Sequence, residues 1–119
     1  MKTNDAVAAL AALAQETRLA VFRLLVEQGA VGLSAGEIAE KVGIAPAALS
    51  FHLKELAHAR LVRSRQEGRY VFYSADFASM NRLLAFLTQN CCAADSGACG
   101  PAACAPSPST RATSRKAKA

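Results

Sequence analysis

The sequence predicts a mainly α-helical protein, with about five helices and a two-stranded β-hairpin, that folds as a winged helix-turn-helix. Apolar residues recur every three or four positions along most of residues 1–92, which is the period of an amphipathic helix. Between residues 61 and 74 the period changes to two around a turn that contains Gly68, as is typical of a β-hairpin. Two predicted helices separated by a glycine turn lie directly before this hairpin.

The first two helices are predicted from the spacing of their apolar residues. The first helix carries Val7, Leu10, Leu13 and Ala14 on one face. A second helix begins at Glu16 and ends at two glycines. Its apolar residues are Leu19, Phe22, Leu25 and Val26, and the two glycines are Gly29 and Gly32. Only 6% of the 119 residues are aromatic, so the core is small, and we expect a dimer that shares apolar surface between two copies.

A short helix and a longer one form the central pair. Ser34 followed by Glu37 is a capping-box pattern, which predicts a short helix over 35–42 that ends at Gly43. The next helix is predicted over 46–59 and begins with a proline, which suits a first helical turn. Its buried face carries Leu49, Leu53 and Leu56.

The hairpin is predicted from two short strands, 61–65 and 70–74, on either side of a turn at 66–69. A last helix is predicted over 77–90, where apolar residues again recur at three- and four-residue steps.

The composition changes after residue 92. From residue 93 to the end there is no Val, Ile, Leu, Met, Phe or Tyr, and three of the four prolines lie there. Such a segment buries too little apolar area to offset the entropy lost on ordering. The sequence therefore predicts a folded domain over 1–92 and a flexible tail, with a basic end, over 93–119.

Charge is unevenly distributed along the chain. Residues 41–82 carry seven Lys and Arg against three carboxylates, whereas residues 1–40 carry three against five. A basic middle suits a polyanion, and the alternative is a solvated surface with chance clustering. No apolar run approaches the roughly 20 residues that span a bilayer, and the first residues lack the layout of a secretion signal. We therefore expect a cytoplasmic protein with no membrane partner.

The helix over 46–59 and the hairpin are the predicted contacts to double-stranded DNA, because a helix fits the major groove and a hairpin reaches phosphates or the minor groove. Phe51 is expected to contact a thymine methyl group, or else to pack against a wing or a partner chain. His52 projects toward the apolar side, so a structural role competes with a base contact. The full set predicted to contact DNA is Ala47, Ser50, Phe51, His52, Lys54, Arg63, Arg65 and Arg69.

Five short stretches of the sequence form a recognisable set: Leu49-Ser50-Phe51-His52-Leu53, Leu61-Val62, Gly68-Arg69, Tyr73 and the opening Leu-Ala-Gln-Glu-Thr-Arg-Leu over 13–19. As a set they resemble the DNA-binding core of the ArsR/SmtB family of metalloregulatory repressors. The resemblance covers roughly residues 7–90. It implies a homodimer in which the first and last helices form the interface and two recognition helices read a palindromic operator. The interface residues expected are Leu10, Leu13, Phe77, Met80, Leu84 and Leu87. Ala45 departs from the family, whose members often have a serine cap there.

The four cysteines form the predicted inducer site. Cys91, Cys92, Cys99 and Cys104 lie within fourteen residues, and thiolates select soft metals. Three converging thiolates suit arsenite or antimonite. Adjacent cysteines diverge on a helix, so Cys99 is expected to return as the third ligand, with Cys104 as an alternative or fourth ligand. This arrangement resembles a subgroup of the family with a vicinal cysteine pair after the last helix.

Other sites of the family lack their ligands here. The Cys-x-Cys positions of the founding arsenic sensors correspond to Ser34 and Gly36, and the last helix contains no histidine. The alternatives left open are a repressor that responds to zinc, cadmium or thiol oxidation, and a thiol metal buffer that binds no DNA. No catalytic set of residues is visible, so an enzyme is not expected.

Overall fold

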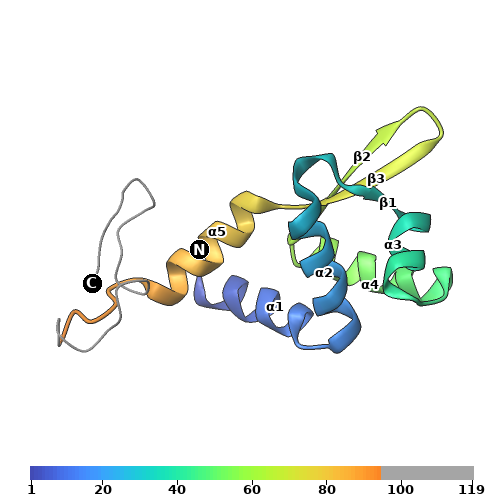
Figure 1. Ribbon diagram of the computed structural model, residues 1–119. Helices are drawn as coiled ribbons and strands as arrows, with labels where there is room; N and C mark the ends of the chain where they lie inside the picture. The colour runs from blue at the N-terminus through green and yellow to red at the C-terminus, as the bar shows by residue number, and fades with distance from the viewer. Residues whose placement is uncertain (95–119) are drawn as a thin grey trace, which may run out of the picture. The chain divides into compact units, whose positions relative to one another are not determined.

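Within residues 1–94, the part of the chain that the computed structural model describes, five α-helices accompany a three-stranded antiparallel sheet (Figure 1). Residues Met1–Leu83 form one compact unit, and a second unit begins at Leu84. The elements in order are α1 (Thr3–Leu13), α2 (Glu16–Gln28), a 3-10 turn η1 (Gly29–Val31), β1 (Leu33–Ser34), α3 (Ala35–Val42), α4 (Pro46–His58), β2 (Val62–Glu67), β3 (Tyr70–Ala75) and α5 (Phe77–Thr88). The predicted mainly α-helical winged helix-turn-helix is confirmed.

The helix ends follow the local chemistry that the sequence predicts. The Ser34 hydroxyl accepts from the Glu37 N–H at 3.3 Å, and the Glu37 carboxylate accepts from the Ser34 N–H at 2.9 Å, so the capping box of α3 is present. Gly43 ends α3 in a left-handed conformation. Ala45 precedes α4 without a side-chain cap.

The sheet contains one strand more than predicted. β1 pairs antiparallel with β3, with Leu33 opposite Tyr73 and Ser34 opposite Phe72. Two residues are too few to show a period of two, so this strand is set by its distant partner and not by a local pattern. Gly32 precedes it with φ 72°, and a Cβ atom there would collide with the carbonyl oxygen of Tyr73.

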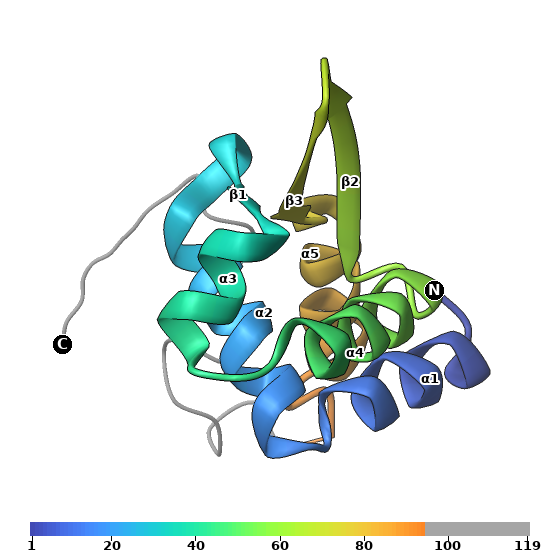
Figure 2. The same ribbon diagram turned by 90° about the vertical axis from the view of Figure 1, so that its right-hand side faces the viewer.

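The wing, β2 with β3, extends farther than predicted. Val62 pairs with Ala75 at one end and Glu67 with Tyr70 at the other, so the turn is only two residues long and not the four predicted. Gly68 supplies the positive φ that such a turn requires. After Val62 every residue of β2 is exposed, and the hairpin extends away from the helices (Figure 2).

The core of the first unit lies between α2, α3, α4 and the base of the wing. Its largest fully buried side chains are Val21, Leu25, Ile38, Leu49, Leu56 and Leu61. The leucine face predicted for α4 is therefore confirmed. Full burial of each large aliphatic side chain contributes about 1.5–3 kcal/mol to the stability of the fold.

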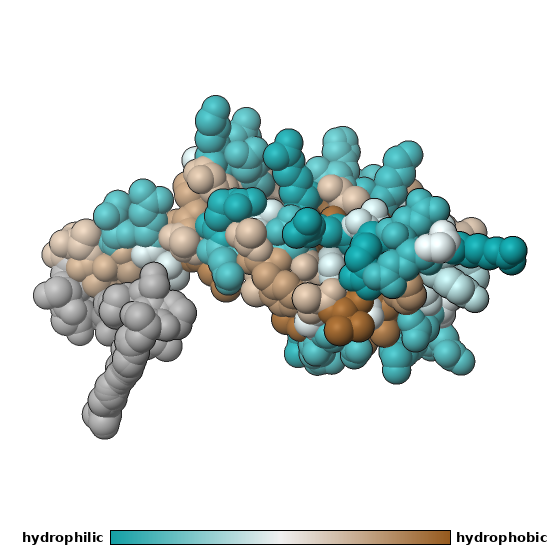
Figure 3. All heavy atoms as spheres, turned by 90° about the horizontal axis from the view of Figure 1, so that it is seen from above, coloured by the Kyte–Doolittle hydropathy of each residue, from teal (hydrophilic) through white to brown (hydrophobic). Residues whose placement is uncertain are grey.

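The face that α1 buries within the chain differs from the apolar face that carries Leu10, a residue expected at the dimer interface. α1 buries three alanines, Ala6, Ala9 and Ala12, whereas Val7 and Leu10 are exposed. Alanine permits the close approach of two helix backbones, so the small residues and not the large ones face the core. Leu19 of α2 is likewise exposed. Apolar side chains therefore reach the surface among hydrophilic ones (Figure 3).

α5 ends at Thr88, two residues earlier than predicted. The Thr88 hydroxyl donates to the Leu84 carbonyl at 2.9 Å, and turns follow through Asn90, which has φ 59°. The domain boundary predicted after residue 92 stays a prediction.

Candidate nucleic-acid interface

The turn between α3 and α4 places the two helices as a helix-turn-helix. The N–H groups of Gly43 and Ile44 both donate to the Ala39 carbonyl, at 2.8 and 3.1 Å. These bonds close the C-terminus of α3, and Pro46 then starts α4 at its first turn. Leu49 and Leu53 anchor α4 to the core.

The opposite face of α4 is exposed. Ala47, Ser50, Phe51 and Lys54 all lie on it, and 57% of Phe51 is accessible to solvent. An exposed aromatic ring beside a hydroxyl and an ammonium group offers both apolar and polar contacts to a base edge. The structure thus brings together four of the five α4 residues that were predicted to contact DNA.

His52, the fifth, lies on a different side of α4. It is half-buried, and its Nδ1 atom lies 3.4 Å from Nη1 of Arg18 on α2. Arg18 also donates from Nε to the Ala12 carbonyl at 2.7 Å. The guanidinium therefore links the end of α1 to α4, and this position favours the structural role for His52. The sequence indicated Arg18 only as one residue of the motif over 13–19.

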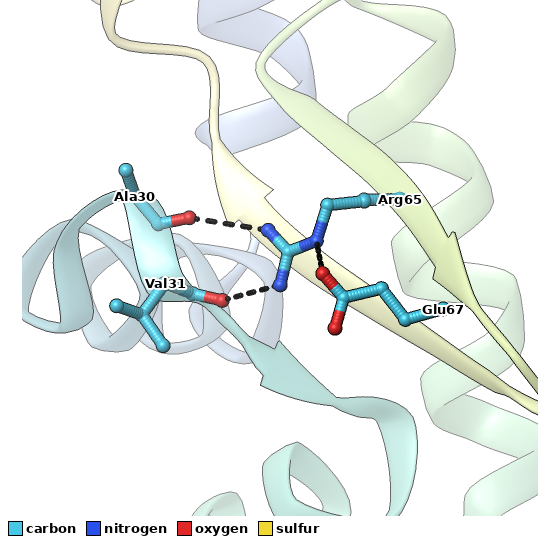
Figure 4. Close-up of polar contacts among 4 residues, drawn as sticks. All are labelled: Ala30, Val31, Arg65 and Glu67. Atoms are coloured by element: carbon cyan, nitrogen blue, oxygen red, sulfur yellow. Dashed lines mark hydrogen bonds and ion pairs between the residues drawn. The ribbon is translucent and has the colours of Figure 1, made fainter.

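The three arginines of the wing differ in what they contact. Arg63 and Arg69 are exposed. The guanidinium of Arg65 instead donates to the Glu67 carboxylate at 2.7 Å and to the carbonyl oxygens of Ala30 and Val31 at 3.4 and 3.2 Å (Figure 4). Its role as a DNA contact stays a prediction, because these partners already hold it against η1.

Two aromatic residues of β3 line the wing beside these arginines. Tyr70 is 66% exposed next to the two-residue turn, and the centroid of its ring lies 6.4 Å from that of Phe72. Sequence reasoning missed Tyr70 as a candidate contact, although the signal was present: an aromatic residue directly follows the basic turn of the hairpin.

The capping box fixes one charge near this surface. Hydrogen bonds from the backbone N–H and then from the hydroxyl of Ser34 lower the pKa of Glu37, and Lys41 contributes to the same shift. Glu37 is therefore held as a carboxylate at the N-terminus of α3, where the helix dipole also favours a negative charge.

The structure describes two of the four cysteines that were predicted as metal ligands. Cys91 and Cys92 lie in turns beyond α5, both half-buried, with Cys92 at φ 59°. Their sulfur atoms are 3.6 Å apart. The expectation that the two side chains diverge on a helix is therefore wrong, because the helix ends before them. Cys99 and Cys104 lie outside the described residues, and within residues 1–94 no group of three His, Cys, Asp or Glu side chains converges.

The residues predicted for the dimer interface are partly exposed. Leu10, Leu84 and Leu87 are exposed, and the others, Leu13, Phe77 and Met80, are half-buried. Over residues 1–94 the structure also contains no helix long and apolar enough to cross a bilayer.

Comparison with known proteins agrees with this architecture. A family model described as a helix-turn-helix domain matches residues 13–65. The chain is 32% identical over 97 residues to the transcriptional activator HlyU of Vibrio cholerae, across 80% of this chain and 87% of HlyU.

Two solved structures are similar to it. An ArsR-like transcriptional regulator from Rhodococcus sp. RHA1 has a TM-score of 0.64 and 30% identity, and the match covers 71% of this chain and 76% of that one. Mb0332 from Mycobacterium bovis, described as a homodimeric winged helix-turn-helix DNA-binding domain, has a TM-score of 0.58 and 27% identity over 73% of this chain and 81% of that one. With this identity, coverage and fold, the chain belongs to the ArsR-like family of helix-turn-helix transcriptional regulators.

Proposed function

We propose that this protein is a repressor that binds a palindromic operator as a homodimer and releases it when arsenite or antimonite binds a C-terminal cysteine cluster. The observation that carries the DNA-binding part is the exposed polar face of α4 beside a basic wing. The observation that carries the inducer part is the close approach of two sulfur atoms after α5.

The shape of α4 and the wing supports DNA binding. An α-helix fits the major groove, and its preceding helix fixes the angle at which it enters. Ser50 and Lys54 on α4 then face base edges or phosphates, and Phe51 contacts a thymine methyl group. Arg63 and Arg69 extend the basic surface along the wing, where they reach phosphates.

Exposed apolar residues support a dimer. Val7 and Leu10 are exposed on α1, and, in the second unit, Leu84 and Leu87 are exposed on α5. A second copy that covers such residues removes apolar area from water, at about 25 cal/mol for each Å². A related structure, Mb0332, is described as homodimeric. Two-fold symmetry in the protein requires a matching palindrome in the operator.

The sulfur geometry supports binding of a soft ion. Sulfur atoms 3.6 Å apart can both bind one atom: two ligands of a tetrahedral zinc, with Zn–S bonds of about 2.3 Å, are roughly 3.8 Å apart. This distance suits several thiophilic ions. The preference for arsenite or antimonite rests on a third thiolate, from Cys99 or Cys104, and on a trigonal geometry that leaves one side of the ion open.

Induction follows from linkage. An inducer shifts the protein from its DNA-binding state only by the ratio of its affinities for the two states. Binding of arsenite after α5, next to residues expected at the dimer contact, changes the spacing of the two recognition helices.

The test is a fluorescence anisotropy titration in reducing buffer, with a duplex enriched from random sequence by the protein itself. Arsenite, antimonite, zinc and cadmium are each added to the complex, for the wild type and for four single Cys→Ser variants. We expect arsenite or antimonite to release the wild-type protein, and Cys91→Ser and Cys92→Ser to remain bound. Release that persists unchanged in both variants would refute the cysteine cluster as the inducer site.

The same cysteines support a second candidate, a thiol-redox regulator, because Cys92 is disulfide-bonded and its sulfur atom lies 3.6 Å from that of Cys91. An oxidant such as diamide would then release DNA without arsenite, and dithiothreitol would restore binding. The third alternative, a thiol metal buffer, predicts no sequence preference among duplexes and only a shallow dependence of binding on salt.

A further inference from the structure

A polar cavity of about 470 Å³ lies in the first unit. It is lined by the start of α1, the end of α4 and the start of α5, and the first two of these lie side by side in Figure 2. Its cationic or imidazole side chains come from all three elements: Lys2, His58, Arg60 and Arg82. The lining carboxylate is that of Asp5, which accepts from the backbone N–H of Lys2 at 3.3 Å.

The backbone at Arg60 is unusual. Arg60 has φ 64°, a left-handed conformation. The N–H of Leu61 donates to the Leu56 carbonyl and that of Arg60 to the Ala57 carbonyl, both at 3.0 Å. This pair of bonds is a Schellman motif, in which the position of Arg60 is usually glycine. An arginine there costs conformational energy that glycine would avoid, and its side chain lines the cavity.

A buried hydroxyl completes the cavity wall. Ser79 is only 4% exposed, and its hydroxyl accepts from Nη2 of Arg82 at 3.0 Å. A hydroxyl that accepts in this way still has its own proton to donate. The bond also holds the Arg82 guanidinium at the cavity edge, where its other N–H groups can serve a ligand.

We propose that this cavity binds a phosphate group, free or as the ester of a small molecule. Arg60, Arg82 and Lys2 provide three positive charges against one carboxylate, and two guanidinium groups match the oxygen geometry of a phosphate. The site is separate from the DNA-facing surface, because it lies at the C-terminal end of α4, whereas Ala47 and Ser50 lie near the other end. At 100° per residue, Leu10 lies roughly 140–160° around α1 from Asp5 and Ala8, two residues that line the cavity.

The test is a two-dimensional amide NMR titration of the full chain with sodium phosphate, against sodium chloride at equal ionic strength. We expect saturable shifts at Arg60, Leu61 and Ser79 with phosphate and not with chloride. Arg60→Gly keeps and relaxes the left-handed backbone, so this variant folds, and it should weaken phosphate binding at least tenfold, as should Arg82→Gln. Arg23→Gln removes an exposed arginine outside the cavity and should bind as the wild type does.

The sources of the phosphate are distinguished by two further arms. Tighter binding of glycerol phosphate than of inorganic phosphate identifies an ester as the occupant, and the reverse identifies the free ion. The shifts should persist when a saturating DNA duplex is present. Displacement of phosphate by the duplex would overturn the proposal, because the cavity would then belong to the DNA contact. Equal shifts with chloride, or wild-type affinity in both cavity variants, would also overturn it. None of these outcomes depends on arsenite or on operator release.

Discussion

The guanidinium of Arg65 lies over the ring of Phe72, with its central carbon 5.3 Å from the ring centroid. The two residues are also cross-strand partners in the wing. Together with the bonds from Arg65 to Glu67, Ala30 and Val31, this contact ties the wing to the turn that follows α2. One arginine thus sets the direction in which the basic hairpin extends.

Arg65 and Arg69 should therefore differ when each is changed to Gln. Arg65→Gln removes hydrogen bonds to Glu67, Ala30 and Val31, and since these bonds are exposed the free energy of unfolding should fall by no more than about 1 kcal/mol. It should leave the slope of log affinity against log salt unchanged. Arg69→Gln should leave stability unchanged and reduce that slope by about 1. Urea denaturation measures the free energy of unfolding, and anisotropy at several salt concentrations measures the slope. A smaller slope for Arg65→Gln, with unchanged stability, would show that Arg65 contacts phosphate.

Arg18 should be needed for stability in a way that its neighbour Arg23 is not. Arg18→Gln removes the donor to the Ala12 carbonyl and the contact with His52, which should cost about 1–2 kcal/mol. Arg23 is an exposed arginine on the same helix, and Arg23→Gln should change stability by less than about 0.5 kcal/mol. Equal urea midpoints for the two variants would contradict this.

The α3 capping box should make stability depend on pH. The pKa of Glu37 is lowered from its usual 4.5 on folding, so its carboxylate contributes stability that is fully present above pH 4.5. This stability is lost as the pH falls through the lowered pKa of the folded state. Ser34→Ala removes the hydroxyl, which is the second cause of the pKa shift, and keeps the backbone N–H, which is the first. The loss of the cap should cost about 1 kcal/mol at neutral pH.

The measurement is the free energy of unfolding between pH 3 and 7, as a difference between wild type and variant. That difference should shrink on acidification. A difference that stays constant, or grows, as the pH falls would mean that the Ser34 hydroxyl does not stabilise the Glu37 carboxylate.

The glycines at 29, 32 and 36 should respond differently to alanine. Gly32→Ala combines a positive φ with a collision against the Tyr73 carbonyl and should cost about 2 kcal/mol or more. Gly29 has the same φ but open space. Its ψ of −158° lies in a region that is essentially restricted to glycine, so Gly29→Ala should cost about 1–2 kcal/mol. Gly36 lies in α3 with open space around it, and alanine there should stabilise by about 1 kcal/mol. The unfolding temperatures of the three variants should follow this order. If Gly32→Ala is not the least stable of them, the close pairing of β1 with β3 at Tyr73 does not limit residue 32.

Phe51 should set base preference more than affinity for DNA in general. Phe51→Ala should relax selection of thymine at one position of each half-site, with a loss of about 1–3 kcal/mol in discrimination. Its non-specific affinity and its stability should change little, because the ring is exposed. Selection from random duplexes, followed by sequencing, measures this. Unaltered base preference would favour the alternative, a contact with the wing or a partner chain.

Local signals in the sequence were enough for most of the fold. The Ser34–Glu37 spacing predicted the start of α3, and the leucines of α4 predicted its buried face, because both depend on residues within one or two turns. β1 was missed because its two residues pair with Tyr73 and Phe72, about 40 positions away. The buried face of α1 was missed because close helix packing selects alanine over the larger Val7 and Leu10.

The residues of the candidate site differ in how far the sequence predicts their surroundings. The exposed face of α4 follows from the helical period, so the exposure of Phe51 and Lys54 was predicted correctly, and their contact with DNA stays a prediction. The partners of Arg65 are distant backbone carbonyls, which leave no mark in a sequence pattern. The approach of the Cys91 and Cys92 sulfur atoms depends on α5 ending at Thr88, and the end of a helix without a glycine or proline stop is poorly defined by sequence.

The affinity for arsenite, measured with and without operator DNA, tests the linkage between inducer and operator most directly. Isothermal titration of arsenite into the reduced protein, free and saturated with its selected duplex, yields two dissociation constants. If arsenite releases the repressor, the DNA-bound form must bind arsenite more weakly, by the same factor by which arsenite weakens DNA binding. Identical arsenite affinities in the two titrations would contradict the account.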